Sequence, residues 1–329
     1  MHLDPFELHR PATVEETVAL ARELAGRFDY LAGGTDLLAN YKMHLNAKPH
    51  LIALDRLAPL RERRLDRIGA MVRLAELERD GAIRSAYPAL AEAVDQVATP
   101  LVRASATVGG NLLVDTRCFF FNQSYFWRAS LGFCLKADGD RCHVVPQKER
   151  CYATFSGDLA PALLVLDAEV EIVGPDGRRR IPLASLYDEG GDGIRRHRLA
   201  PGEFLAAVTL PEAARRRSST YAKLRVRPSF DFPELGVAVA CRWAGDRLEH
   251  LAVATGGLET YPRRWDDVTA PFVGRRASSE LFREVGAAIR PRVRPVHNTF
   301  LPPDYRKQMT ELFVRRALER LAPTSGAAG

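Results

Sequence analysis

The sequence predicts an α+β fold of two or three domains, and three observations support this prediction. At 329 residues, the chain is long enough to bury more than one hydrophobic core. Segments with apolar residues at helical spacing are interspersed with segments that alternate like strands. Near the end of the chain, a predicted strand hairpin precedes two predicted helices, which favours a C-terminal α+β domain with an antiparallel sheet.

The N-terminal region shows both kinds of pattern. Thr13 and Glu16 form a capping-box pair, and Gly26 can end the helix that they begin. The apolar residues of that helix fall on one face: Val14, Val18, Ala21 and Ala25. Short strands are predicted at about 29–32 and 51–54.

In the middle of the chain, we expect helices at 88–97 and 159–166 and a strand at 168–173. Pro88 suits a first helical turn, and Pro100 marks the end of that helix. The segment 117–152 has no clear period and is rich in Phe, Cys, Lys and Arg. Loops this long are uncommon unless they are functional, so we interpret this segment as an inserted loop.

The C-terminal region begins with a polar segment at 215–219, which we interpret as a boundary loop, followed by a strand at 221–226. Strands at 236–243 and 247–255 flank a turn and predict a hairpin. Helices are expected at 279–290 and 304–321. The second has an apolar stripe at every fourth residue: Met309, Phe313, Ala317 and Leu321.

Composition and charge narrow the function classes. Hydrophobic residues make up 46% and charged residues 27%, as in ordinary soluble proteins. No stretch approaches the roughly 18 apolar residues of a membrane span, and the N-terminus lacks an apolar signal segment, so we expect a cytoplasmic protein. The net charge of +6 comes from short basic clusters without a nucleic-acid-binding module. A mildly basic surface suits an acidic electron carrier or a coenzyme A ester.

Two glycine loops are candidates for binding a dinucleotide. They are Leu31-Ala32-Gly33-Gly34-Thr35-Asp36 and Thr107-Val108-Gly109-Gly110-Asn111, and neither matches the Rossmann or P-loop motif. Adjacent glycines let the backbone approach a ligand and aim N–H groups at one point. Each loop alone is equally typical of a plain strand–turn–helix corner. Together, two loops about 75 residues apart could hold one pyrophosphate from both sides.

Four of the five cysteines lie within one segment: Cys118, Cys134, Cys142 and Cys151. Structural zinc sites usually have closer cysteine pairs, and four thiolates can also hold an iron–sulfur cluster. The spacing alone leaves a cluster, a zinc site and coincidence open, and His143 is an alternative ligand. Nearby basic residues suit an anionic cluster, and aromatic residues between 119 and 133 could shield it from water. We expect Cys241, on an apolar strand, to be an inert core residue.

The segments GGTDLL and ATVGGNL resemble the FAD-binding subunits of the molybdenum hydroxylases, the family of xanthine dehydrogenase and carbon monoxide dehydrogenase. The resemblance covers nearly the whole chain. It implies a vanillyl-alcohol-oxidase/PCMH-type FAD-binding domain at 1–213, with subdomains at about 1–55 and 56–213. A C-terminal domain at 214–323 and a disordered tail at 324–329 follow. The implied FAD contacts are Leu31, Ala32, Gly33, Gly34, Thr35, Asp36, Thr107, Gly109, Gly110, Asn111, Asp158 and Lys223.

The insertion, at about 115–153, indicates a more specific resemblance within this family. The segments DTRC, GFCLK and RCYAT, which contain Cys118, Cys134 and Cys151, resemble the β subunit of 4-hydroxybenzoyl-CoA reductase. This resemblance implies a [4Fe-4S] cluster on the four cysteines and no catalytic residue in this chain. Lys223, as a cation near the isoalloxazine, would stabilise reduced flavin.

The implied function is electron transfer within a larger enzyme. A low-potential, ferredoxin-like donor would supply electrons to a partner [2Fe-2S] small subunit and a molybdenum-cofactor large subunit. There they would support reductive dehydroxylation of 4-hydroxybenzoyl-CoA or a related aryl-CoA. One alternative is the FAD subunit of a molybdenum hydroxylase that oxidises an aromatic or N-heterocyclic substrate. Another is a freestanding flavin oxidase.

Overall fold

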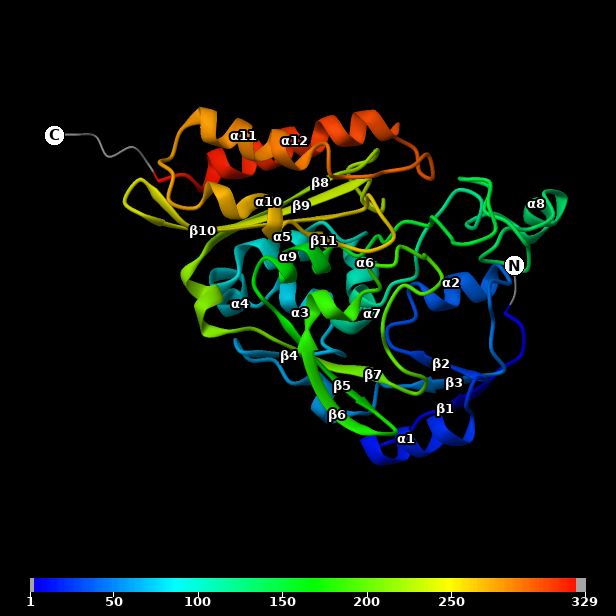
Figure 1. Cartoon of the computed structure of the whole chain (residues 1–329). Helices are drawn as coiled ribbons and strands as arrows, with labels where there is room; N and C mark the ends of the chain where they lie inside the picture. The colour runs from blue at the N-terminus through cyan, green and yellow to red at the C-terminus, as the bar shows by residue number, and fades with distance from the viewer. Residues whose placement is uncertain (1–2, 324–329) are drawn as a thin grey trace.

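A computed structural model describes residues 3–323 as three sheets with their helices (Figure 1). The first sheet is parallel, with strand order β1-β3-β2. The predicted capping box of Thr13 and Glu16 is confirmed, and Gly26 follows the helix with a φ of +75°. The elements here are β1 (Glu7–His9), α1 (Val14–Glu23), β2 (Phe28–Leu31), α2 (Leu37–Lys42) and β3 (His50–Ala53).

The second sheet is antiparallel, with strand order β4-β7-β5-β6. Its strands are β4 (Arg67–Gly69), β5 (Glu169–Gly174), β6 (Gly177–Pro182) and β7 (Phe204–Thr209). The helices of this region are α3 (Leu74–Glu78), α4 (Gly81–Ala86), α5 (Pro88–Asp95), α6 (Pro100–Arg103), α7 (Val108–Leu112) and α9 (Leu159–Leu164). Pro100 therefore begins a short helix of its own, because Thr99 caps that helix by accepting from the Val102 N–H.

The third sheet is antiparallel, with strand order β11-β10-β9-β8. Helices α11 and α12 cover its outer face, and α5 and α9 lie against the inner face (Figure 1). The elements are β8 (Ser218–Leu224), β9 (Leu235–Ala244), β10 (Arg247–Gly256), β11 (Arg263–Arg264), α10 (Asp266–Thr269), α11 (Ser279–Ile289) and α12 (Pro303–Leu321).

Two details of the C-terminal region differ from the sequence prediction. The polar segment expected as a boundary loop enters β8 at Ser218, and Ser219 and Thr220 are buried because hydrogen bonds satisfy their hydroxyls. On α12, the predicted stripe packs against the core and Ala317 is buried, but the most deeply buried line passes beside it, through Val314 and Leu318. The helix is therefore rotated about its own axis relative to the orientation that the apolar stripe predicts.

The core is continuous across the boundary between the second and third sheets. Ala238, Ala240, Ala252 and Ala254, on the inner face of the C-terminal sheet, share one apolar cluster with α5 and α9. A separate cluster fills the space between that sheet and α11 and α12. The predicted tail at 324–329 lies outside the described residues.

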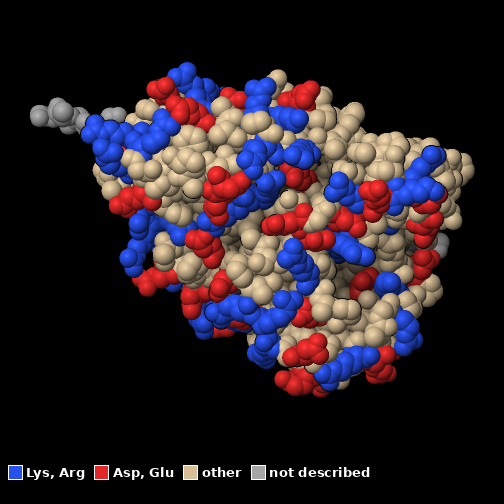
Figure 2. All heavy atoms as spheres, in the orientation of Figure 1, with Lys and Arg blue, Asp and Glu red and all other residues tan. Residues whose placement is uncertain are grey.

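The insertion projects from one side of the molecule and contains a single short helix in the described chain, α8 (Tyr125–Ser130) (Figure 1). Basic and acidic side chains are intermixed on the visible face (Figure 2), as expected for short, solvated charge clusters. None of the helices in residues 3–323 is long and apolar enough to cross a membrane.

Candidate functional site

The first glycine loop connects β2 to α2 and is open for ligand binding. A Cβ at Gly33 would lie 2.0 Å from the carbonyl oxygen of Ser105, and Gly34 has a φ of +71°. Both positions therefore require glycine. Within residues 3–323, the backbone N–H groups of Gly33, Gly34 and Thr35 donate to no acceptor of the chain. Three consecutive free donors at a tight turn fit a pyrophosphate.

The second glycine loop forms the first turn of α7, and most of its N–H groups already have partners. Thr107 caps the helix by accepting from the Gly110 N–H at 3.1 Å. The N–H groups of Val108 and Gly109 donate to carbonyls of the neighbouring backbone. A Cβ at Gly110 would lie 3.8 Å from the Cβ of Ala32, so the two glycine loops face each other. The second loop therefore lets the backbone lie close to the first loop, but it offers few free N–H donors to a ligand.

Asn111 joins this loop to the start of α9. Its Oδ1 accepts a hydrogen bond of 3.0 Å from the Leu159 N–H. Its side-chain amide nitrogen donates to no acceptor in the described part of the chain. That amide can still donate to a ligand at the glycine loops.

Asp158 and Lys223 form a buried ion pair, with Lys223 Nζ 3.0 Å from Asp158 Oδ2. The Tyr221 hydroxyl donates to the same carboxylate at 2.7 Å, and Lys223 also donates to the Gln96 carbonyl at 3.0 Å. Burial raises the pKa of Asp158 and lowers the pKa of Lys223, while each partner opposes the shift of the other. The pair joins α9 to β8, and its contact with FAD stays a prediction.

The structure brings the four predicted cysteines together around one cavity. Cys118, Cys134, Cys142 and Cys151 are all buried and line one small cavity. Cys241 lies apart from them, in the core of the C-terminal sheet.

No three of the four sulfur atoms in this described segment lie within 4.8 Å of one another. A tetrahedral zinc ion with Zn–S bonds of ~2.3 Å would hold them about 3.8 Å apart. The sulfur atoms are therefore too widely spaced for a single zinc ion.

Burial raises the pKa of two of the four thiols, those of Cys118 and Cys151. It raises the pKa of Cys118 to about 11, although the N–H groups of Phe120 and Phe121 act in the opposite direction. It raises the pKa of Cys151 to about 12, with the charge of Lys136 opposing the shift. Cysteines bind metal as thiolates, so loading the site releases protons.

The aromatic residues of the insertion divide into two groups. Phe120 and Phe121 line the cavity, as expected for side chains that exclude water. Phe126 is 83% exposed and Tyr125 is 54% exposed, so the expectation that all these aromatics shield the cysteines is wrong. The reason is that α8 turns both rings outward. His143 lines the cavity, but its Nε2 already lies 2.5 Å from the Phe133 carbonyl oxygen.

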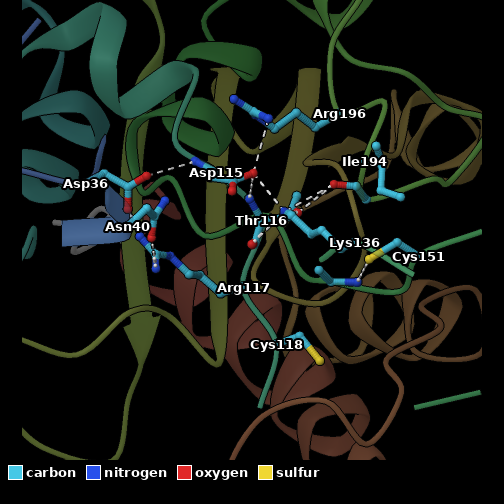
Figure 3. Close-up of polar contacts among 12 residues, drawn as sticks. Asp36, Asn40, Asp115, Thr116, Arg117, Cys118, Lys136, Cys151, Ile194 and Arg196 are labelled. Atoms are coloured by element: carbon cyan, nitrogen blue, oxygen red, sulfur yellow. Dashed lines mark hydrogen bonds and ion pairs between the residues drawn. The ribbon is translucent and has the colours of Figure 1, made fainter. Parts of the chain in front are cut away.

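A polar network connects the first glycine loop to the cysteine cavity (Figure 3). The Asp115 N–H donates to Asp36 Oδ2 at 3.3 Å, and the Asp115 carboxylate accepts from Lys136 Nζ at 2.7 Å. Arg196 pairs with the same carboxylate at 3.1 Å, and Arg117 pairs with Asp36. Lys136 is buried, lines the cavity and lies 4.5 Å above the ring of Phe121.

Sequence reasoning counts Lys136 only among the basic residues near the cysteines and misses Asp115, the carboxylate that Lys136 and Arg196 share. The signal in the sequence is that Asp36 ends the first glycine loop and Asp115 stands four residues after the second. Arg196 comes from a distant loop without a motif, so its approach depends on the tertiary fold.

Comparison with known proteins identifies the family to which this chain belongs. Residues 4–213 match the family described as the FAD binding domain in molybdopterin dehydrogenase. Residues 219–321 match the carbon monoxide dehydrogenase flavoprotein C-terminal domain. The chain belongs to the FAD-binding oxidoreductase subunits of the molybdenum hydroxylase family.

Several relatives cover most of the chain. The aldehyde oxidoreductase FAD-binding subunit PaoB of Escherichia coli is 35% identical over 79% of this chain and 83% of its own length. The carbon monoxide dehydrogenase medium chain of Hydrogenophaga pseudoflava is 26% identical over 95% of this chain and 96% of its own. A solved structure of carbon monoxide dehydrogenase from that organism superposes with a TM-score of 0.79 at 25% identity, covering 98% of both chains.

Proposed function

We propose that this chain is the FAD- and [4Fe-4S]-binding electron-transfer subunit of a heteromeric molybdenum enzyme. One observation carries the proposal: the four insertion cysteines converge on one cavity, and the Asp36–Asp115–Lys136 contacts join that cavity to the first glycine loop. FAD exchanges one or two electrons and a cluster exchanges one. The chain would therefore relay electrons between two cofactors and a partner subunit.

The FAD part of the proposal rests on the free N–H groups of Gly33 to Thr35 and on the close approach of the two loops. A Gly33→Val variant should lose at least about nine-tenths of its bound flavin, because the added side chain displaces the loop from Ser105. Gly81→Ala is the matched control, since a Cβ there meets nothing within 4 Å. Flavin content is measured after gel filtration. Equal flavin in Gly33→Val and Gly81→Ala would refute this assignment.

The cluster part rests on the four buried sulfur atoms and on their wide spacing, which suits a polynuclear centre better than a single zinc ion. Purified under anaerobic conditions, the protein should contain about four iron atoms and four sulfides per chain. Cys134→Ser should lose most of the iron, and Cys241→Ser should retain it. Stoichiometric zinc without iron, or equal iron in both variants, would refute the cluster.

The partners follow from the kind of relative that the chain matches. Those relatives are, by name, an FAD-binding subunit and medium chains, and they match along most of their length. This favours a subunit over a freestanding flavin oxidase. We infer a molybdenum-cofactor large subunit and a [2Fe-2S] small subunit as partners, with the cluster as the entry or exit point for a one-electron carrier such as ferredoxin. Co-purification of the tagged chain and mass spectrometry of its partners test this inference.

Two substrate classes are candidates for the complex. The 35% identity to an aldehyde oxidoreductase subunit favours an aldehyde. The cysteine-bearing segments of the insertion favour an aryl-CoA, as in 4-hydroxybenzoyl-CoA reductase. The purified complex should be assayed with benzaldehyde and an artificial acceptor, and with 4-hydroxybenzoyl-CoA and a reduced low-potential dye. Turnover of only one substrate would decide between them, and turnover of neither would reject both.

A further inference from the structure

A cluster of metal-binding side chains lies on the first sheet, outside the sites described above. Glu7 and His9 point to the same face of β1 because they are two residues apart, and His50 is the register partner of Glu7 on β3. The three side chains are the one group of potential ligands within residues 3–323 whose donor atoms all lie within 4.8 Å of one another. We propose that they form a zinc-binding site.

The spacing of the donor atoms fits a single tetrahedral ion. His9 Nε2 lies 3.2 Å from His50 Nδ1 and 3.7 Å from Glu7 Oε1, and His50 Nδ1 lies 3.4 Å from Glu7 Oε2. Zinc bonds of ~2.0–2.1 Å to nitrogen and oxygen place tetrahedral neighbours about 3.4 Å apart. An octahedral ion with similar bonds would bring them to about 3.0 Å. The same distance criterion thus excludes a single zinc ion at the cysteines and supports one here.

Solvent access and ligand chemistry also fit. The imidazoles are 18% and 17% exposed, while Glu7 is 65% exposed. The ion can therefore enter from solvent on the carboxylate side. Two imidazoles and a carboxylate form a typical zinc ligand set that keeps a fourth position for water.

The position of the site indicates what the metal does. β1 is a three-residue edge strand, and its central residue, Leu8, is 46% exposed. Few apolar contacts therefore hold this strand to the sheet. His9 and His50 are 41 residues apart, and the segment between them contains the first glycine loop. A metal that bridges these residues closes that long segment and restricts its unfolded states, which stabilises it.

The test uses the full chain with its own cofactors. The protein is incubated with two equivalents of zinc, desalted and analysed for metal, and the zinc ligands are measured by X-ray absorption. We expect one added zinc per chain with a nitrogen and oxygen shell at about 2.0–2.1 Å, without the sulfur shell at about 2.3 Å that cysteine binding would produce. Zinc should also slow amide exchange of residues 10–49.

Two variants and a control make the result decisive. His50→Gln removes a nitrogen ligand, and Glu7→Gln removes the carboxylate from an exposed position where the fold tolerates it. Both should lose the added zinc and its effect on amide exchange, whereas His297→Gln, at an exposed histidine elsewhere, should keep both. Equal zinc retention in all four proteins, or a sulfur shell, would overturn the site. Zinc binding without slower exchange in residues 10–49 would overturn its role.

Discussion

The insertion and the C-terminal domain maintain their structures in different ways. The C-terminal domain is a four-stranded sheet under two helices, and side chains such as Val285 and Leu318 fill its core. The insertion has one short helix, and three of the seven buried residues in its apolar cluster are Cys118, Cys134 and Cys151. Cys241, by contrast, is one apolar residue among many in the C-terminal core.

This contrast shows what each region requires for stability. A sheet with covering helices satisfies its own backbone hydrogen bonds and buries enough apolar surface to be stable. An irregular segment whose buried cysteines hold the proposed cluster would depend on that metal for part of its folding energy. The two regions should therefore respond differently to cofactor removal and to core substitution.

Iron removal should distinguish the two regions most directly. With iron chelated, amides in residues 118–151 should exchange at least about tenfold faster, equivalent to about 1.4 kcal/mol of local stability. Amides in β9 and β10 should be unchanged. Hydrogen–deuterium exchange with mass spectrometry measures both regions in one sample. Equal acceleration in the two regions would contradict the comparison.

A cavity in the C-terminal core should have the reverse effect. Leu318→Ala should lower the free energy of unfolding by about 2–5 kcal/mol, because it empties a site that is 1% exposed. Iron content should remain normal. Val273→Ala, at a position that is 45% exposed, is the control and should change little. Urea unfolding with an iron assay on the same preparation checks both statements.

Removing the ammonium of Lys136 should weaken the insertion to a smaller extent. Lys136→Met leaves the Asp115 carboxylate with Arg196 and the Thr116 N–H as its remaining partners, which should cost about 2–3 kcal/mol. The loss of a positive charge at the cavity should also lower the reduction potential of the proposed cluster. Lys148→Met is the control, because Lys148 forms an exposed pair with Asp140. Identical potentials in the two variants would exclude the charge effect.

His197, on the loop that packs against the insertion, should produce the smallest effect, a dependence on pH. Burial and the nearby Arg196 lower the pKa of His197 from 6.5 to about 4, and its Nδ1 has no partner in the described residues. The unfolded chain binds this proton at higher pH, so the associated stability is present above pH 6.5 and is lost as pH falls toward 4.

From pH 7 to pH 5, this loss should amount to about 2 kcal/mol. His197→Gln should flatten that part of the pH dependence of unfolding. His297→Gln should retain it. An unchanged slope in His197→Gln would show that other groups cause the acid sensitivity.

The sequence predicts the helices and strands well, but it predicts poorly which distant segments contact one another. Helix α1 follows directly from its capping box, and the β9–β10 hairpin follows from its turn. Local patterns of this kind are sufficient because each involves neighbouring residues. The resemblance predicts that the four cysteines come together. Their spacing alone does not, because it leaves an iron–sulfur cluster, a zinc site and coincidence open.

Contacts between distant segments had no local signal. The approach of Gly33 to Ser105 and the bond between Lys136 and Asp115 exist only after several elements have packed together. The same holds for the glutamate–histidine cluster. Its Glu7-x-His9 pair is visible in the sequence, whereas the pairing with His50 depends on the order of strands in the sheet.

The side chain of Asn298 has a consequence for biosynthesis. Its side-chain amide nitrogen donates to the Tyr152 carbonyl and, at 2.6 Å, to Thr154 Oγ1, and the backbone carbonyl of Asn298 accepts from the Phe119 N–H. It thereby joins both ends of the insertion beside Cys118 and Cys151. Asn298 follows Thr154 by 144 residues, which takes roughly 7 to 30 s to translate. During that interval Cys118 and Cys151 have been synthesised, but the C-terminal segment that closes over them has not.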